Sequence, residues 1–346
     1  MSEHEIILRR LFNQQIAESK FKKPAEIVNW LVAMQSQEWA MAKWAIGLRL
    51  PGSTDADIED AFNNGDILRT HIMRPTWHFV TPADIRWLLA LTAPRVNAFN
   101  TPYYRKMELD TKIFKRADTI FTKMLQGGKQ LNRLLLKEAL EKNKIKTNDL
   151  RFMLLLMRAE LDGLVCSGAR VNKQFTYALL EERVPATKSF HRTEALAELV
   201  KRYFITRGPA TVQDFAWWSG LTVRDAKEGL TMNKSLFDSE KVNGVEFFFN
   251  PVSIDLKKNT QLTFLLPDYD EYGISYKNRS IIFDPRNKMG NETRTKHVII
   301  IDGKAGGAWE RSRNRKGVNT FLFSSLNKTK LAAVNKAIKK YSLFFV

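Results

Sequence analysis

Apolar residues recur every three to four positions in three segments near the start of the chain, the spacing of amphipathic helices. The segments are 4–16, 24–33 and 37–50. Ser36 is a favourable helix N-cap, which would place Gln37 and Glu38 in the first turn of the third helix. Two amides, Gln35 and Gln37, would then bracket a helix N-terminus, where unpaired N–H groups and the helix dipole favour negative charge. The alternative is that both amides only satisfy the backbone of the turn.

The pattern changes after a short fourth helix predicted over 56–63. Residues 67–73 and 76–80 are rich in β-forming residues and are joined by Arg74-Pro75, which predicts a two-stranded ribbon. A group of helices followed by such a ribbon is typical of a winged helix. A further helix is expected to run from about 82 to 91.

The same plan recurs twice along the chain. Predicted helices over 111–125, 132–143 and 149–162 precede strands over 164–167 and 173–178. Predicted helices over 193–206, 212–219 and 223–230 precede strands over 237–241 and 245–249, which meet at the hairpin signal Asn243-Gly244. Residues 208–227 are the clearest helix-turn-helix, with two short helices around a glycine.

The last third of the chain has a different pattern. It predicts a closing helix over 328–341 and strands over 263–266, 298–301, 304–309 and 318–323, with Asp302-Gly303 as a type I′ turn. The predicted fold class is therefore α+β: tandem winged-helix units followed by a β-rich C-terminal part. The predicted domains are 1–92, 93–190, 191–260 and 261–346.

Composition and charge narrow the possible partners. The chain has 346 residues, 44% of them hydrophobic, which is enough for ordinary globular cores. Its formal net charge is +18, and residues 270–346 contain 16 Lys and Arg against 6 Asp and Glu. A globular chain this basic usually meets a polyanion such as nucleic acid, anionic lipid or an acidic partner. The alternative is a solvated basic face that only confers solubility.

One basic loop lies between two of the predicted strands, over 310–317. Its cations are Arg311, Arg313, Arg315 and Lys316. Nothing in the loop can build a core, so we expect a solvent-facing hairpin tip whose cations suit a DNA groove or backbone. The alternative is a solvated charge run that contributes only long-range attraction.

The expected compartment is the cytoplasm. Cys166 is the single cysteine, so no intrachain disulfide can form. The charged first residues lack the apolar region of a signal peptide. The longest apolar run, 152–157, is far too short to span a bilayer, so no membrane association is expected.

Three stretches resemble the winged-helix DNA-binding family that includes the AlkZ-type alkylpurine DNA glycosylases. Residues 31–39, LVAMQSQEW, match the family's Gln-x-Gln element, and residues 68–80 with Pro82 match its first wing. Residues 265–272, LLPDYDEY, with Tyr276 and Arg279, match a third element. The chain departs from the family pattern at Ser36, where characterised members tend to be aliphatic, and at Arg74-Pro75, where many have Arg-Gly.

The resemblance implies tandem winged helices arranged around duplex DNA. It also implies that Gln35 and Gln37 are the catalytic pair. Neutral amides are weak general acids and bases, but they can orient a water and stabilise developing charge. That chemistry suffices only for an activated leaving group, such as a purine made cationic by alkylation at N7 or N3.

Other candidate residues surround this pair. Glu38, Asp270 and Glu271 are possible bases or supporting groups; the alternative is a structural role, as a helix-start charge at Glu38 and a turn or ion pair at Asp270. The candidate DNA contacts in the first ribbon are Arg69, His71, Arg74 and His78. The two histidines have no further ligand nearby in the sequence, so we expect phosphate contacts or hydrogen bonds within the wing and no metal site.

The predicted function is hydrolysis of the N-glycosidic bond of alkylated purines in duplex DNA. The predicted enzyme needs no cofactor, binds double-stranded DNA and is a monomer. The alternative is a non-catalytic winged-helix DNA-binding protein or regulator. Retention of Gln-x-Gln favours the enzyme, because groove readout by a regulator would favour Arg, Asn or Ser there.

Overall fold

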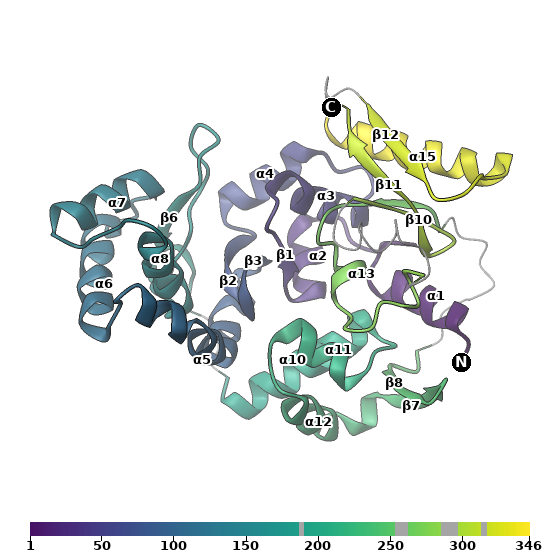
Figure 1. Ribbon diagram of the computed structural model, residues 1–346, viewed down its shortest axis with the longest axis horizontal. Helices are drawn as coiled ribbons and strands as arrows, with labels where there is room; N and C mark the ends of the chain where they lie inside the picture. Colours follow the sequence, from purple (N-terminus) through teal and green to yellow (C-terminus); the bar gives the residue numbers. More distant parts are fainter. Residues whose placement is uncertain (187–189, 253–261, 285–296, 313–316) are drawn as a thin grey trace. The chain divides into compact units, whose positions relative to one another are not determined.

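The structure is a computed structural model that describes residues 1–186, 190–252, 262–284, 297–312 and 317–346. The chain forms two compact units (Figure 1). Unit 1 comprises Met1–Glu59, Leu196–Trp218 and Thr222–Val346, and unit 2 comprises Asp60–Ala195 with Ser219–Leu221. Unit 2 is thus inserted into the sequence of unit 1. The four predicted domain boundaries stay a prediction.

Unit 1 begins with the predicted helices. They are α1 (Glu3–Asn13), α2 (Pro24–Leu31), α3 (Trp39–Arg49) and α4 (Asp55–Asn64), the last of which crosses into unit 2. A capping box between Ser2 and Glu5 starts α1, and Pro24 occupies the first turn of α2. The predicted start of the third helix at residue 37 is wrong: Met34–Gln35 form a short strand, β1, and Glu38 is the N-cap of α3.

The second part of unit 1 contains the predicted helix-turn-helix. Its elements are α10 (Arg192–Arg207, entering from unit 2), α11 (Val212–Ser219), α12 (Val223–Met232), a 3-10 turn (Lys234–Leu236), β7 (Asp238–Val242) and β8 (Val245–Phe249). Thr222 caps α12 through a capping box. Asn243 and Gly244, the predicted hairpin connection, both have positive φ, as a type I′ turn requires. Tyr203, Phe204 and Phe215 pack their rings together in the core of this part.

The C-terminal part of unit 1 is a four-stranded antiparallel sheet of order β12-β11-β10-β9. Its elements are β9 (Phe264–Leu266), α13 (Glu271–Ile274), β10 (Val298–Ile301), β11 (Lys304–Arg311), β12 (Val318–Leu322) and the closing helix α15 (Lys328–Phe344). Helix α15 lies along the sheet (Figure 1), and its Tyr341 and Phe344 contact Trp44 of α3. The α3 backbone comes so close here that a Cβ at Gly47 would clash with Phe344.

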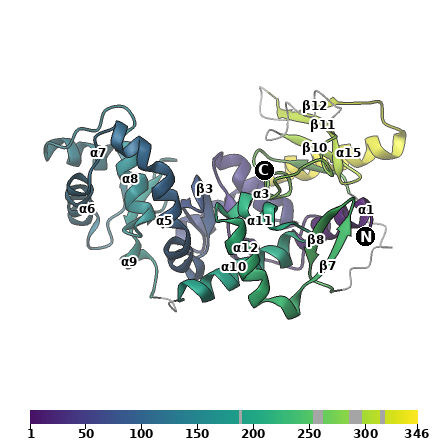
Figure 2. The ribbon, with the colours of Figure 1, turned by 60° about the horizontal axis from the view of Figure 1, so that its bottom comes forward.

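Unit 2 packs helices against two small sheets. Its elements are β2 (Leu68–Ile72), β3 (Arg74–Val80), α5 (Pro82–Lys106), α6 (Thr111–Leu125), β4 (Leu131–Asn132), α7 (Arg133–Lys142), α8 (Arg151–Leu161), β5 (Val165–Ser167), β6 (Thr176–Leu179) and α9 (Leu180–Arg183). Helices α6, α7 and α8 lie near one another (Figure 2). Their side chains form a core that includes Phe121, Leu136 and Leu155. Strands β4 and β5 flank β6.

Three predicted boundaries in unit 2 are wrong. Arg74-Pro75 is not the hairpin connection: Met73 alone turns with φ +62°, and Arg74 already begins β3. Helix α5 continues to Lys106 through Pro94 and Pro102, well past residue 91. Helix α8 starts at Arg151, because Asp149 has φ +51°, which a right-handed helix cannot contain.

Helices combined with small antiparallel sheets confirm the predicted α+β class. The grouping of these elements into tandem winged helices stays a prediction. Within the described residues, every helix is too short or too polar to cross a membrane.

Candidate active site

The Gln-x-Gln segment lies between α2 and α3, ahead of the helix. Gln35 belongs to β1 and is 8% exposed, Ser36 is fully buried, and Gln37 is exposed. Glu38 is exposed and makes no side-chain hydrogen bond that caps α3. The two amides therefore stand on an extended backbone ahead of α3 and not within the helix.

A strained turn precedes this segment. Val32 has φ +67° and ψ −55°, and the Ala33 N–H donates to the Leu31 carbonyl at 2.7 Å. These are the features of a classic γ-turn, which is rare and strained, and more so for a β-branched residue. Such a conformation costs about 1–3 kcal/mol and persists only where surrounding contacts impose it.

Arg207, the last residue of α10, supplies those contacts. Its Nη1 donates to the Leu31 carbonyl and its Nη2 to the Ala33 carbonyl, each at 3.0 Å. The guanidinium is fully buried and lies 4.3 Å from the ring of Trp218. Arg207 thus grips both ends of the γ-turn that leads into Gln35.

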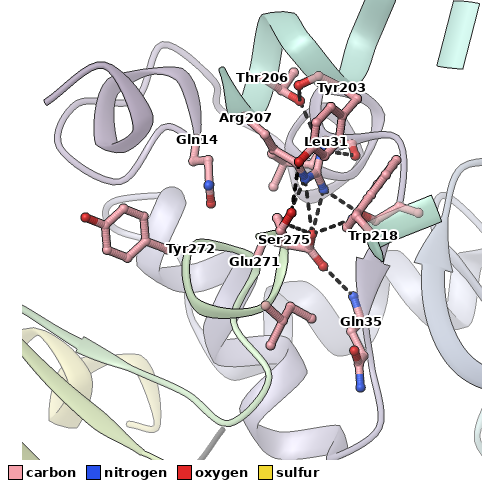
Figure 3. Close-up of polar contacts among 12 residues, drawn as sticks. Gln14, Leu31, Gln35, Tyr203, Thr206, Arg207, Trp218, Glu271, Tyr272 and Ser275 are labelled. Carbon is pink, nitrogen blue, oxygen red and sulfur yellow. Dashed lines mark hydrogen bonds and ion pairs between the residues drawn. The ribbon is translucent and has the colours of Figure 1, made fainter. Parts of the chain in front are cut away.

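Glu271, the first residue of α13, completes the arrangement. Its Oε2 accepts from Arg207 Nη2 at 2.7 Å, and its Oε1 accepts from the Gln35 backbone N–H at 2.9 Å. Oε2 also accepts from Trp218 Nε1 at 3.0 Å and Ser275 Oγ at 2.8 Å. Figure 3 shows these donors converging on the carboxylate, while the side chain of Gln35 extends away from it. The network fixes the backbone from which the Gln35 side chain extends.

Asp270 is held in a second buried ion pair. Arg49 donates to its two carboxylate oxygens at 2.7 and 2.8 Å, and Asp270 also accepts the Tyr272 N–H as the N-cap of α13. A bidentate Arg–carboxylate pair of this kind is strong and fixed in geometry. Asp270 and Glu271, both candidate bases, are therefore each paired with a buried arginine.

Tyr276 ties this cluster to α1 and α10. Its hydroxyl accepts from Gln14 Nε2 and donates to the Arg207 carbonyl, both at 2.9 Å. Burial raises the pKa of Tyr276 to about 12, so the hydroxyl stays protonated and can make that donation at neutral pH. The resembling stretch 265–272 with Tyr276 thus supports the Gln-x-Gln segment.

The candidate residues of the ribbon lie in unit 2. Arg69 is buried, with its guanidinium 4.2 Å from the ring of Trp77 and 4.7 Å from that of Phe175. His71 stands opposite Trp77 and His78 opposite Thr70, so the two histidines point to opposite faces of the ribbon. Both are buried, whereas Arg74 is partly exposed.

His71 pairs with a buried carboxylate. Its Nδ1 makes a short contact with Glu160 Oε2 of α8, and its ring packs on Trp77 at 4.5 Å. In the part of the chain that the structure describes, no group of three or more His, Cys, Asp or Glu is placed to hold a metal ion.

The basic loop is described only at its base. Strands β11 and β12 pair antiparallel up to Arg311 opposite Val318, which confirms the predicted hairpin. Arg311 lies 4.6 Å from the ring of Phe345. Arg313, Arg315 and Lys316 lie outside the described residues.

Sequence reasoning missed the residues that hold the site together. Arg207, Arg49 and Ser275 carry no motif, and Arg49 and Arg207 lie 221 and 64 residues from their carboxylate partners. The one available signal was Trp217-Trp218, a helical pair of which only one side chain can face the core. Trp218 is that residue, and it contacts Glu271.

Comparison with known proteins decides the family. A family model described as DNA glycosylase AlkZ-like matches residues 28–344, nearly the whole chain. The chain belongs to the AlkZ-like DNA glycosylase family. The structure is similar to that of the Streptomyces sahachiroi DNA glycosylase AlkZ, with a TM-score of 0.80 and 19% identity over 99% of this chain and 96% of that one. No curated protein sequence matches the chain.

Family membership confirms the resemblance on which the catalytic prediction was based. This AlkZ-like protein is a DNA glycosylase, with DNA as its substrate and a role in DNA repair. Between the two functions considered from the sequence, the family supports the enzyme over the non-catalytic regulator.

Proposed function

We propose that this AlkZ-like enzyme releases cationic N7- or N3-alkylated purines from duplex DNA, with Gln35 and Gln37 as the catalytic pair. The observation that carries the proposal is the Glu271–Arg207 network, which fixes the backbone of Gln35 in the segment that carries both amides. Preorganised polar groups of this kind stabilise developing charge because they need no reorganisation during the reaction.

The state of the carboxylates supports a cationic leaving group. Asp270 and Glu271 are buried in ion pairs with Arg49 and Arg207, so neither is free to activate water without breaking its pair. Glu38 is exposed and remains the one candidate base of the three with access to solvent. Neutral amides that orient water suffice when alkylation has already made the base a good leaving group.

The proposed DNA contacts differ in accessibility. Arg74 and Arg311 are partly exposed and can reach a phosphate directly. His71 and His78 are buried, so in this proposal they shape the ribbon that carries Arg74. Arg69, also buried, keeps the ring of Trp77 in place. The proposed set of DNA contacts also includes Arg313, Arg315 and Lys316. The monomeric state and the cytoplasmic location stay predictions.

The test is release of N7-methylguanine from alkylated duplex DNA by the purified protein. Gln35→Ala and Gln37→Ala should each slow release by about 10²-fold, the scale for losing one preorganised polar group. Gln126→Ala, at an exposed glutamine in unit 2, is the matched control and should leave release unchanged. Melting temperatures of all three variants should stay close to that of the parent protein.

A second substrate tests the charge argument. The same duplex with uracil, a neutral base, in place of the alkylated purine should show no release above background. Efficient uracil release would contradict the cationic specificity, and full activity of both glutamine variants would move the reaction to Glu38.

A further inference from the structure

A large hollow lies within unit 1, beside the helix-turn-helix. It has a volume of about 1520 Å³ and lies between α11, α12, the β7–β8 hairpin and the segment 277–283. Small-molecule sites usually enclose about 300–1,000 Å³, so the hollow is larger than one such ligand needs. No residue of the Gln35 segment lines it.

The hollow displays an aromatic ring held in a fixed position. Trp217 is 43% exposed, and the chain's seven other tryptophans are all more buried. Its Nε1 donates to the Ile274 carbonyl at 3.2 Å, which fixes the ring at the edge of α13. The Arg279 guanidinium lies 5.9 Å from the ring. Val212 and Phe248 add apolar surface to the lining.

Cations dominate the rest of the lining. Lys227, Lys234 and Lys277 are exposed, and none of the three forms an ion pair with a described residue. Of the two acidic residues, Asp214 is buried and accepts the N–H groups of Thr211 and Lys277. Glu246 accepts from Ser239 Oγ at 3.1 Å. The hollow therefore presents more positive than negative charge.

A cationic groove with an aromatic platform suits a strand whose bases are unstacked. Phosphates meet the lysines, and a base can stack on an aromatic face whatever its identity. A duplex keeps its bases inside and offers this surface mainly phosphates, which would leave Trp217 and the apolar lining without a partner. The volume and the chemistry together favour several nucleotides of one strand over a duplex or a free nucleotide.

We propose that this hollow is a binding site for single-stranded DNA, distinct from the duplex site of the proposed glycosylase reaction. It lets the protein hold an unpaired strand while Gln35 and Gln37 face a lesion. The site acts through Trp217 stacking and through Lys227, Lys234, Lys277 and Arg279.

The experiment is fluorescence anisotropy with a labelled, lesion-free oligothymidylate of about ten nucleotides, compared with a lesion-free duplex, near 50 mM salt. Neither probe contains a base to release, so the outcome does not depend on glycosylase activity. The parent protein should bind the single strand, and Trp217→Ala should lower the ratio of single-strand to duplex affinity by about fivefold or more. Trp217→Phe keeps an aromatic face and should retain most of the affinity.

Charge variants keep the proposal testable if Trp217→Ala proves poorly folded. Lys227→Ser/Lys277→Ser should weaken single-strand binding and flatten its salt dependence by about 0.7 log–log units per lost phosphate contact. Lys336→Ser/Lys339→Ser, which removes two exposed charges from α15, is the matched control and should change the slope little. Equal losses in both double variants, no single-strand binding by the parent protein, or full binding by a folded Trp217→Ala variant would overturn the proposal.

Discussion

Two glutamates, one in each unit, are each 1% exposed but sit in very different surroundings. Glu271 accepts hydrogen bonds at both oxygens, from Gln35, Arg207, Trp218 and Ser275. Glu160 contacts His71 through Oε2, while its Oε1 has no hydrogen-bond partner among the described residues.

The difference separates a carboxylate that organises a site from one that is only buried in a core. Desolvating a carboxylate is expensive, and hydrogen bonds and an opposite charge offset that cost only when they are numerous and well placed. Glu271 meets this condition and also positions the backbone of Gln35. Glu160 meets it in part, so its charge should matter far less to stability.

The largest expected effect is at Glu271. In Glu271→Gln, an amide NH₂ would face donors at Arg207, Trp218 or Ser275, and a buried guanidinium would lose its counter-charge. We expect a loss of about 3–5 kcal/mol in the free energy of unfolding, the range for breaking a buried ion pair. Urea denaturation measures it, and a loss below about 1 kcal/mol would contradict the role assigned to the network.

Lys340, a partly buried cation that forms no ion pair with a described residue, sharpens the comparison. Lys340 Nζ donates to the Leu48 carbonyl at 2.7 Å, and burial, with a contribution from nearby Arg49, lowers the pKa of Lys340 to about 8. Below pH 8 Lys340 is charged in both the folded and the unfolded protein, and the folded protein carries the full cost of burying that charge. As the pH rises towards about 10.4, the pKa of lysine in the unfolded chain, Lys340 of the folded protein is already neutral and the cost of burying its charge disappears.

The stability of the parent protein should therefore rise relative to Lys340→Met between pH 8 and 9.5, by about 1.5 kcal/mol. The comparison with the variant cancels the opposite trend expected from Tyr203 and Tyr276, whose pKa values burial raises. Urea denaturation of both proteins at the two pH values gives the difference. A constant difference would mean that Lys340 is solvated and carries no such cost.

The smallest expected effect is at Glu160. Glu160→Gln removes a buried charge, keeps an acceptor for His71 and places its NH₂ where one oxygen already lacks a partner. We expect a change of about 1 kcal/mol or less in the free energy of unfolding. Glu271→Gln is the same substitution at a residue of the same burial. Equal losses in the free energy of unfolding at both positions would contradict the distinction between the two carboxylates.

Local signals account for most of the fold that could be predicted. Asp302 and Gly303 adopt positive φ as their hairpin requires, and Thr222 starts α12 through its capping box. Helix α6 has the predicted bounds, because Asp110 caps its start. These features depend on residues within a few positions of one another. Such local patterns can be recognised in a single sequence.

The start of α3 shows why the rest could not be predicted. Ser36 is a favourable N-cap by local rules, but Arg207 and Glu271 hold the preceding backbone in a γ-turn and a short strand. Those partners lie 174 and 236 residues away, so no local pattern reveals them. The Gln-x-Gln motif could be found in the sequence, but its support could not.

Because unit 2 is inserted into unit 1, the two halves of the Gln35–Glu271 network are synthesised at different times. Gln35 leaves the ribosome 236 residues before Glu271, and at about 5–20 residues per second that interval is roughly 12–50 s. Throughout it, the segment that becomes the γ-turn lacks the carboxylate that completes its network, and unit 2 is synthesised and can begin to fold within that time. The site is therefore assembled only after unit 2 has been synthesised, and a nascent chain truncated before residue 271 should be inactive however well its first 195 residues have folded.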